Sequence, residues 1–305
     1  MIEHTPVIED VTLTMIVRDE IINPAGGLLP VLELQAPHYP EVVIVDTGSV
    51  DGTRELLERL SGRDFYPHIK VFDHRFNGYA DARNFANSKV GTKYAMVVDA
   101  DEIFFKQGIE KLAEIILNLN PLGVQIIFYN INIHNPIIAG YKCRGMGWDT
   151  RCYQTAHVVF NHLYGEDVQF TSGDLKKIIV TSHYSQSSYL SDKTCEEILS
   201  IHHFIPNSSM YSDLNRKSDI TLKFDEWYDV FDYRLRRNTS PSECKHFMNW
   251  KTPSVETLAR YGINLDDVLS RLKSFGIKLP RKTKKRMEMC VKLNIDNNQI
   301  ASNPQ

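Results

Sequence analysis

The residues best suited to chemistry in this chain are two aspartates that follow an apolar run. The stretch AMVVDADEIF places Asp99 and Asp101 one residue apart at its end. Side chains two apart in an extended chain point to the same face, so the carboxylates are expected to converge. Converging carboxylates repel each other unless a cation lies between them, and Mg²⁺ or Mn²⁺ binds such oxygens together with substrate phosphates. The pattern predicts a divalent-cation site, although a solvated acidic turn has the same sequence.

A second polar set, VIVDTGSVDGT, occupies residues 43–53. Asp46 ends an apolar run, where a carboxylate can accept a hydrogen bond from a base N–H or a sugar hydroxyl. The two glycines permit sharp turns, and the serine, threonines and aspartate that follow are typical helix caps. Neither the GxGxxG nor the GxxxxGKS spacing is present, so phosphate-binding loops of those types are excluded. A third set, YADARNFAN, places Arg83 on a helix just before the DAD strand, either at the surface or facing the site.

These residues are separated by alternating strands and helices. Strands are predicted over 11–17, 41–46, 68–73, 93–99 and 123–132, and helices over 27–35, 51–60, 79–90 and 108–119. The alternation predicts an α/β fold with a mixed, mostly parallel sheet flanked by helices. Such sheets bind ligands at the carboxyl ends of their strands, so Asp46 and Asp99 are expected to line one crevice.

The second half of the chain is less regular. We expect a strand–turn–strand unit over 157–170, a strand over 176–184, a helix over 194–204 and two or three short helices over 254–293. His202 and His203 would then lie on a helix, packed or solvated. The pattern divides the chain into a domain over 1–204 and a mainly helical, basic C-terminal extension over 205–305.

Charge is distributed unevenly along the chain. Residues 1–200 hold 17 Lys and Arg against 26 Asp and Glu, net −9, and residues 201–305 hold 18 against 12, net +6. The basic part predicts an anionic partner or a solvated tail. The five cysteines have no metal-binding spacing, which indicates reduced thiols and a cytoplasmic location, or the host cytoplasm for a viral protein. No apolar window is long enough for a membrane span, and the first residues do not read as a signal peptide.

Four motifs, MIVRDE, VVIVDTGSVDGT, GYADARNFA and VVDADE, occur in this order. Together they resemble the nucleotide-sugar-binding half of family 2 glycosyltransferases with the Rossmann-like GT-A fold, near the lipopolysaccharide-core glucosyltransferases. The resemblance covers roughly residues 10–200. It implies a metal-dependent, inverting enzyme that uses Mn²⁺ or Mg²⁺ and a nucleotide sugar, most of all a UDP-sugar.

The resemblance also assigns residues to the donor nucleotide and its metal. It places Val17 and Arg18 near the base, Glu20 near the ribose, Asp46 at the uracil or ribose, Arg83 near the base and diphosphate, Asp99 and Asp101 at the metal with Asp99 nearer the ribose, His183 at the metal or diphosphate, and Lys193 at the departing phosphate. The general base would be Glu166 or its neighbour Asp167. The family's usual histidine before this acid is replaced by Gly165, so the choice between the two stays open.

The sequence leaves open the identity of the acceptor and two alternative classes of protein. The acceptor is a bacterial envelope glycan, a hydroxymethylated pyrimidine in phage DNA, or a protein. A nucleotidyltransferase also binds a metal through paired acids, but it would need a glycine-rich, lysine-containing loop that MIVRDEIINPAGG lacks. A non-catalytic binding module is the remaining alternative, and the intact acidic pair argues against it.

Overall fold

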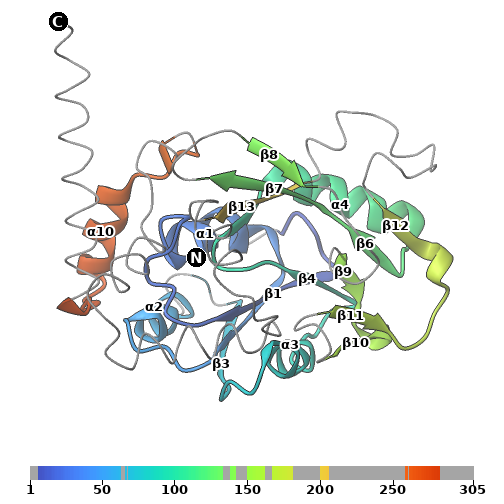
Figure 1. Cartoon of the computed structure of the whole chain (residues 1–305), viewed down its shortest axis with the longest axis horizontal. Coiled ribbons are helices and arrows are strands. Elements are labelled where there is room, and N and C mark those ends of the chain that lie inside the picture. Colours follow the sequence, from blue (N-terminus) through green and yellow to red (C-terminus); the bar gives the residue numbers. More distant parts are fainter. Residues whose placement is uncertain are drawn as a thin grey trace, which may run out of the picture.

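A seven-stranded sheet dominates the part of the chain that the computed structural model describes (Figure 1). The described residues are 6–62, 66, 68–132, 138–141, 150–161, 167–180, 200–205, 258–259 and 261–281. The strand order is β12-β6-β9-β4-β1-β2-β3. The bounds are β1 Val11–Val17, β2 Glu41–Asp46, β3 Ile69–Asp73, β4 Tyr94–Val97, β6 Gly123–Gln125, β9 Thr150–Gln154 and β12 Ile178–Val180. Neighbouring strands pair in parallel except at β9, which is antiparallel to β4 and β6, so the predicted mostly parallel sheet is confirmed.

Helices cover both faces of this sheet, which is why every residue of β2 is buried. The helices are α1 Leu28–Gln35, α2 Thr53–Leu60, α3 Tyr79–Asn87, α4 Lys106–Leu119 and α10 Leu265–Ser274, with short 3-10 turns at Ala36–His38, Thr155–His157 and Leu175–Lys177. Val42 and Ile44 belong to the large core cluster that also contains α1 residues, whereas Val43 and Val45 pack with Ala86 of α3. Alternate residues of one strand therefore enter two separate cores.

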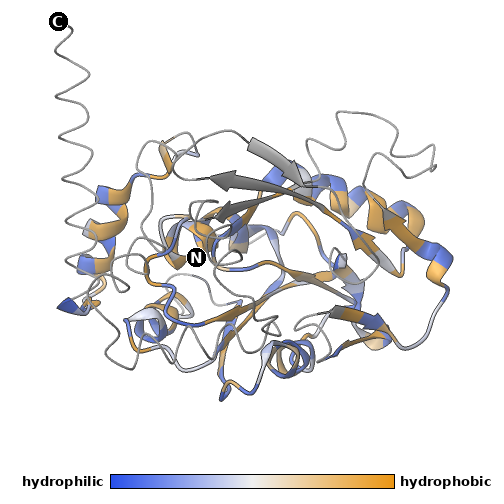
Figure 2. Ribbon diagram, in the orientation of Figure 1, coloured by the Kyte–Doolittle hydropathy of each residue, from blue (hydrophilic) through white to orange (hydrophobic). Residues whose placement is uncertain are grey.

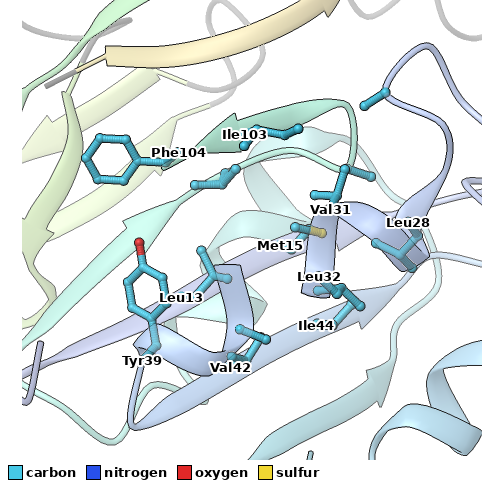
Figure 3. Packing of buried hydrophobic residues seen from close by; sticks show 14 of the residues in the cluster. Leu13, Met15, Leu28, Val31, Leu32, Tyr39, Val42, Ile44, Ile103 and Phe104 are labelled. Atoms are coloured by element: carbon cyan, nitrogen blue, oxygen red, sulfur yellow. The ribbon is translucent and has the colours of Figure 1, made fainter. Parts of the chain in front are cut away.

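The larger core lies between β1, β2 and α1 (Figure 3). The close-up shows apolar side chains of the two strands and the helix packed together: Leu13, Met15, Val42, Ile44, Val31 and Leu32. Colouring by hydropathy shows mainly apolar residues along the central strands and both apolar and polar residues on the described helices (Figure 2). Burial of this apolar surface is the main favourable contribution to folding.

The prediction of a single strand over 123–132 is wrong. The segment divides at Ile126 into β6 and β7 (Ile127–Asn132), which belong to different sheets, and the β6–β9 register shifts between Val124 and Gln125. The smaller sheet has the order β5-β13-β7-β8, with β5 Glu102–Phe104, β13 Ser200–Ile205 and β8 Ile138–Tyr141. The chain therefore passes from the seven-stranded sheet to the smaller sheet at Ile126.

The predicted helix over 194–204 is also wrong where the structure describes it. Residues 200–205 form β13, which pairs in parallel with β7 and antiparallel with β5. His202 and His203 therefore lie on a strand, because tertiary pairing outweighs the helical spacing of the local sequence. The strand–turn–strand unit is confirmed as β10 (Val158–Asn161) and β11 (Asp167–Phe170), an antiparallel pair.

The described part of the C-terminal region packs on the main core. Leu258, Ile263, Leu265 and Leu272 are buried in the cluster that contains β1 and α1. The division of the chain at residue 204 stays a prediction, since residues 206–257 lie outside the described part. Of the helices that the structure describes, none combines the length and apolar character needed to cross a bilayer.

Glu41, at the start of β2, gives a prediction about acid stability. Its carboxylate accepts hydrogen bonds from Thr12 Oγ1 (2.6 Å) and Gly91 N (2.8 Å) and pairs with Lys70. Burial alone would raise the Glu41 pKa, but the bonds from Lys70, Thr12 and Gly91 lower it. The stabilisation is therefore present above the unfolded-state pKa and is lost as pH falls through the folded-state value.

We expect Glu41→Gln to lower the free energy of unfolding by about 1–3 kcal/mol at pH 7. The difference from wild type should shrink towards zero in acid, where the native carboxyl is also neutral. Urea titrations at several pH values measure this, with the exposed Glu55→Gln as control. A loss that does not change with pH would contradict the assignment of the charge effect to Glu41.

Candidate active site

Several residues predicted to bind the donor nucleotide lie at or just after the carboxyl ends of three adjacent strands: Val17, Arg18, Glu20, Asp46 and Asp99. Val17 at the end of β1 lies opposite Asp46 in register, and β4 pairs with β1 up to Thr14 and Val97. Asp99 and Asp101, called the DxD residues below, follow β4 in a turn, where Glu102 N donates to Asp99 O (3.0 Å). The sheet topology therefore places Asp46 and the turn that carries Asp99 and Asp101 at the same edge of the sheet.

The loops after β1 and β2 are joined to each other by side-chain hydrogen bonds. Asp19 N donates to Ser49 Oγ (2.9 Å), and Val50 N donates to Asp19 Oδ1 (2.7 Å). Glu20 N donates to Thr53 Oγ1 (2.8 Å). Asp19 has a positive φ of 57°, a conformation that aspartate tolerates better than most residues. The two loops thus form one unit that carries Arg18, Glu20 and Asp46.

Asp46 has one carboxylate oxygen that the fold satisfies and one that it does not. Oδ1 accepts from Gly48 N and Ser49 N, both at 2.8 Å. Oδ2 is buried, on a residue only 3% exposed, and has no hydrogen-bond partner among the described residues. A buried acceptor left without a donor costs about 1–3 kcal/mol, and more when it is charged. The arrangement is suited to a ligand that brings an N–H or O–H group.

Two arginines and two carboxylates form a neutral cluster beside the DxD turn: Arg83, Asp99, Glu102 and Arg151. Arg83 on α3 is buried and pairs with Asp99. Arg151 on β9 lies 3.0 Å from Glu102 Oε1 and 3.9 Å from Asp99 Oδ2. Asp99 N donates to Glu102 Oε2 (2.8 Å). Burial raises the Glu102 pKa to about 7 although Arg151 acts in the opposite direction.

The sequence predicts that a divalent cation offsets the charge of the two aspartates. For Asp99, the arginines Arg83 and Arg151 are a second source of positive charge. Arg151 was missed because nothing in its local sequence marks it, and its partners lie far away along the chain. Glu102 was part of the quoted VVDADE motif, and its position beside the acidic pair was the available signal.

Asp101 has a different environment from Asp99. Burial and the carboxylates of Glu20, Asp99 and Glu102 raise the Asp101 pKa well above its usual range. Asn23, which sequence analysis missed, joins this turn to the β1 loop. Its Nδ2 donates to Ala100 O (2.6 Å) and to Glu20 Oε2 (3.1 Å). The Asn-Pro pair in INPAGG, a turn-forming dipeptide, was the signal for it.

When both of its carboxyl groups are ionised, the neutral cluster has no net charge. The carboxylates of Asp101 and Glu20 therefore give this part of the site an excess of negative charge. This donor set suits a hard divalent cation, which prefers carboxylate oxygens. Within the described ranges, no three acidic, histidine or cysteine side chains are grouped so that they could hold a metal ion. A cation there would need further oxygens, for which substrate phosphates are the usual source.

The remaining predicted residues are not brought into this arrangement by the described structure. Glu166, His183 and Lys193 lie outside the described residues, and Asp167 is described only as the first backbone position of β11. Arg18, by contrast, lies half-buried in the joined loops, directly after β1. Their roles stay predictions.

These features define a Rossmann-like α/β domain with an acidic carboxyl edge. Residues 31–174 match the model of the family described as Glycosyl transferase family 2. This match, together with the curated relative described next, confirms the resemblance to family 2 glycosyltransferases that the sequence motifs carry.

The chain is similar to a curated relative and to several solved structures. The chain is 31% identical over 117 residues to the putative teichuronic acid biosynthesis glycosyltransferase TuaG of Bacillus subtilis (strain 168), covering 38% of this chain and 44% of TuaG. The match thus spans less than half of that relative. S. aureus TarS 1-349 in complex with UDP-GlcNAc has 14% identity and a TM-score of 0.44, covering 91% of this chain and 78% of TarS 1-349. Another TarS 1-349 structure has 17% identity and a TM-score of 0.40, covering 52% of each chain.

Proposed function

We propose that this chain is a metal-dependent, inverting glycosyltransferase that moves a sugar from a UDP-sugar to an acceptor hydroxyl. The observation that carries the proposal is the buried Oδ2 of Asp46, which lacks a hydrogen-bond donor among the described residues. Uracil N3–H or a ribose hydroxyl supplies such a donor. The family 2 domain supports the same donor class.

In this proposal Asp99 and Asp101 have different roles, because their surroundings differ. Asp99 is paired with Arg83 and holds the guanidinium in place, and the resemblance puts it nearer the ribose. Asp101, with its excess of negative neighbours, is the more direct ligand for Mn²⁺ or Mg²⁺, and His183 is the predicted additional ligand. The bound cation would offset the negative charge that develops on the leaving diphosphate.

The general base of the proposed reaction is Glu166 or Asp167. The carboxylate takes the proton of the acceptor hydroxyl while the acceptor oxygen bonds to the anomeric carbon. The bond from that carbon to the diphosphate breaks, UDP leaves, and Lys193 neutralises its charge. Attack opposite the leaving group inverts the anomeric configuration.

For the acceptor, we favour an envelope glycan because the curated relative is named for teichuronic acid biosynthesis. DNA that contains hydroxymethylated pyrimidines is the second candidate, since residues 201–305 carry a net charge of +6. Mass spectrometry after incubation with nucleotide sugars, Mn²⁺ and either acceptor distinguishes them. The cytoplasmic location predicted from the sequence is retained with this proposal.

The donor assignment predicts that Asp46→Asn weakens UDP binding by about tenfold to a hundredfold, the scale of one hydrogen bond to a charged group. The two backbone donors at Oδ1 should orient the asparagine carbonyl towards them and leave its NH₂ at the Oδ2 position. An acceptor is thereby replaced by a donor without loss of the loop contacts. Isothermal titration calorimetry with UDP measures the change.

A modified ligand distinguishes base recognition from ribose recognition. UDP methylated at uracil N3 should bind wild type more weakly than UDP does, with little further loss in Asp46→Asn. Equal binding of both nucleotides to wild type would move the contact to the ribose. Unchanged UDP affinity in Asp46→Asn would overturn the donor assignment.

A further inference from the structure

The C-terminal segment, residues 258–259 and 261–279, is held in one conformation by its own caps. Asn264 Oδ1 accepts from Asp266 N (2.9 Å) and Asp267 N (3.2 Å) at the start of α10. At the end, Gly276 has a positive φ of 76°, and Ile277 N donates to Leu272 O (3.0 Å). This pattern is a Schellman motif, which reverses the chain after the helix and fixes the position of Ile277.

The segment is bound to the glycosyltransferase domain by apolar and charged contacts. Leu258, Leu265 and Leu272 are buried in the main core. Arg271 on α10 forms a two-pronged ion pair with Glu33 on α1, with Nη1 2.6 Å from Oε2. Figure 1 shows α10 at the edge of the molecule, on the side of α2. The segment is thus part of the same packed body.

Three contacts of this segment fall on the loops and turns that carry the candidate site. A Cβ at Gly26, in the loop after β1, would lie 3.2 Å from Ile263 Cγ2. A Cβ at Gly52, in the loop after β2, would lie 3.1 Å from Ile277 Cγ2. Tyr261 stacks on Phe105, directly after β5, with ring centroids 5.9 Å apart and planes inclined by 14°.

The Gly52 contact lies where the two donor loops join. Asp51 Oδ2 accepts from Ile21 N (3.1 Å), and Asp51 Oδ1 accepts from Thr53 N (3.0 Å). Ile21 Cγ1 also lies 3.9 Å from the position of a Cβ on Gly52. Ile277 therefore packs against the junction that holds the loops of Glu20 and Asp46 together.

We propose that the C-terminal segment sets the position of the nucleotide-binding loops, with Ile277 as the positioning residue. The inference rests on the proposed function, in which the Asp46 loop binds a uridine nucleotide. It assigns part of the donor site's geometry to a segment beyond residues 31–174, the range of the family match. Ile277 acts through Gly52 and Ile21, so it needs no contact with the nucleotide.

Two variants on the full chain test this proposal. Ile277→Ala removes the contact with Gly52. Leu269→Ala is the matched control, because Leu269 is also half-buried against the main core but is not among the nearest atoms to Gly26 or Gly52. We expect Ile277→Ala to weaken UDP binding by roughly three- to tenfold, the scale of coupling from residues away from a ligand. Leu269→Ala should lower the melting temperature similarly and leave the UDP dissociation constant within about twofold of wild type.

Hydrogen exchange without nucleotide provides a second readout that does not depend on the proposed function. Amides of residues 46–53 should exchange faster in Ile277→Ala than in wild type or Leu269→Ala. Unchanged exchange in Ile277→Ala, or an equal loss of UDP affinity in both variants, would overturn the positioning role. If wild type binds no UDP while the exchange difference is present, the proposed function fails and the role of Ile277 in ordering these loops holds.

Discussion

Asp101→Asn is expected to abolish most turnover and, in metal-free protein, to make the fold more stable. The carboxylate is surrounded by Glu20, Asp99 and Glu102, which together with burial raise its pKa. Removing its charge relieves this repulsion, and we expect a gain of about 0.5–2 kcal/mol at pH 7. Turnover should fall roughly 10²–10³-fold, the scale of losing one electrostatic contact to a developing charge.

The pH dependence of this gain has a defined sign. The folded protein binds a proton at Asp101 more readily than the unfolded chain does, so wild-type stability falls as pH rises between the two pKa values. The advantage of Asp101→Asn should therefore be largest at neutral pH and shrink on acidification. Urea unfolding in EDTA across this range measures it, with the exposed Glu110→Gln as control.

A thermal shift with Mn²⁺ separates cation binding from repulsion alone. Added Mn²⁺ should raise the melting temperature of wild type, because a ligand of the folded state stabilises it, and should have little effect on Asp101→Asn. A variant that is less stable than wild type in EDTA would contradict the electrostatic argument. Equal Mn²⁺ shifts in both proteins would exclude Asp101 as the metal ligand.

The main sheet was predictable because its signals are local. The runs that became β1, β2 and β3 are apolar segments bounded by charge, and parallel pairing then places Asp46 and the DxD turn at one edge. Asp99 and Asp101 lie in a turn beyond β4, so the alternation of side chains along a strand does not by itself bring their carboxylates together.

The parts that were not predictable depend on partners distant in the chain. Arg151 reaches Asp99 and Glu102 only because β9 inserts antiparallel between β4 and β6. The strand β13 forms because β5 and β7 offer edges on both of its sides. Neither pairing leaves a periodic pattern or a turn residue that the sequence alone would reveal.

The neutral cluster predicts an asymmetric response when either side of the Arg83–Asp99 pair is removed. The Arg83 side chain is 1% exposed and that of Asp99 is 33% exposed. Asp99→Ala leaves a buried guanidinium without this counter-charge, and we expect it to cost about 3–5 kcal/mol of unfolding free energy. Arg83→Met leaves a carboxylate that reaches solvent and still lies 3.9 Å from Arg151 Nη1, so it should cost less.

The double variant Arg83→Met/Asp99→Ala decides whether charge or packing causes this loss. If the loss of the Asp99 counter-charge beside the buried guanidinium is the main cost, the double variant should be more stable than Asp99→Ala alone, although it removes more native contacts. Urea unfolding of the four proteins completes the cycle. Strictly additive losses would show that the two residues contribute separately, and equal single losses would remove the asymmetry. The expected pattern places the two DxD aspartates in opposite roles, since removing Asp99 destabilises the domain and neutralising Asp101 stabilises it.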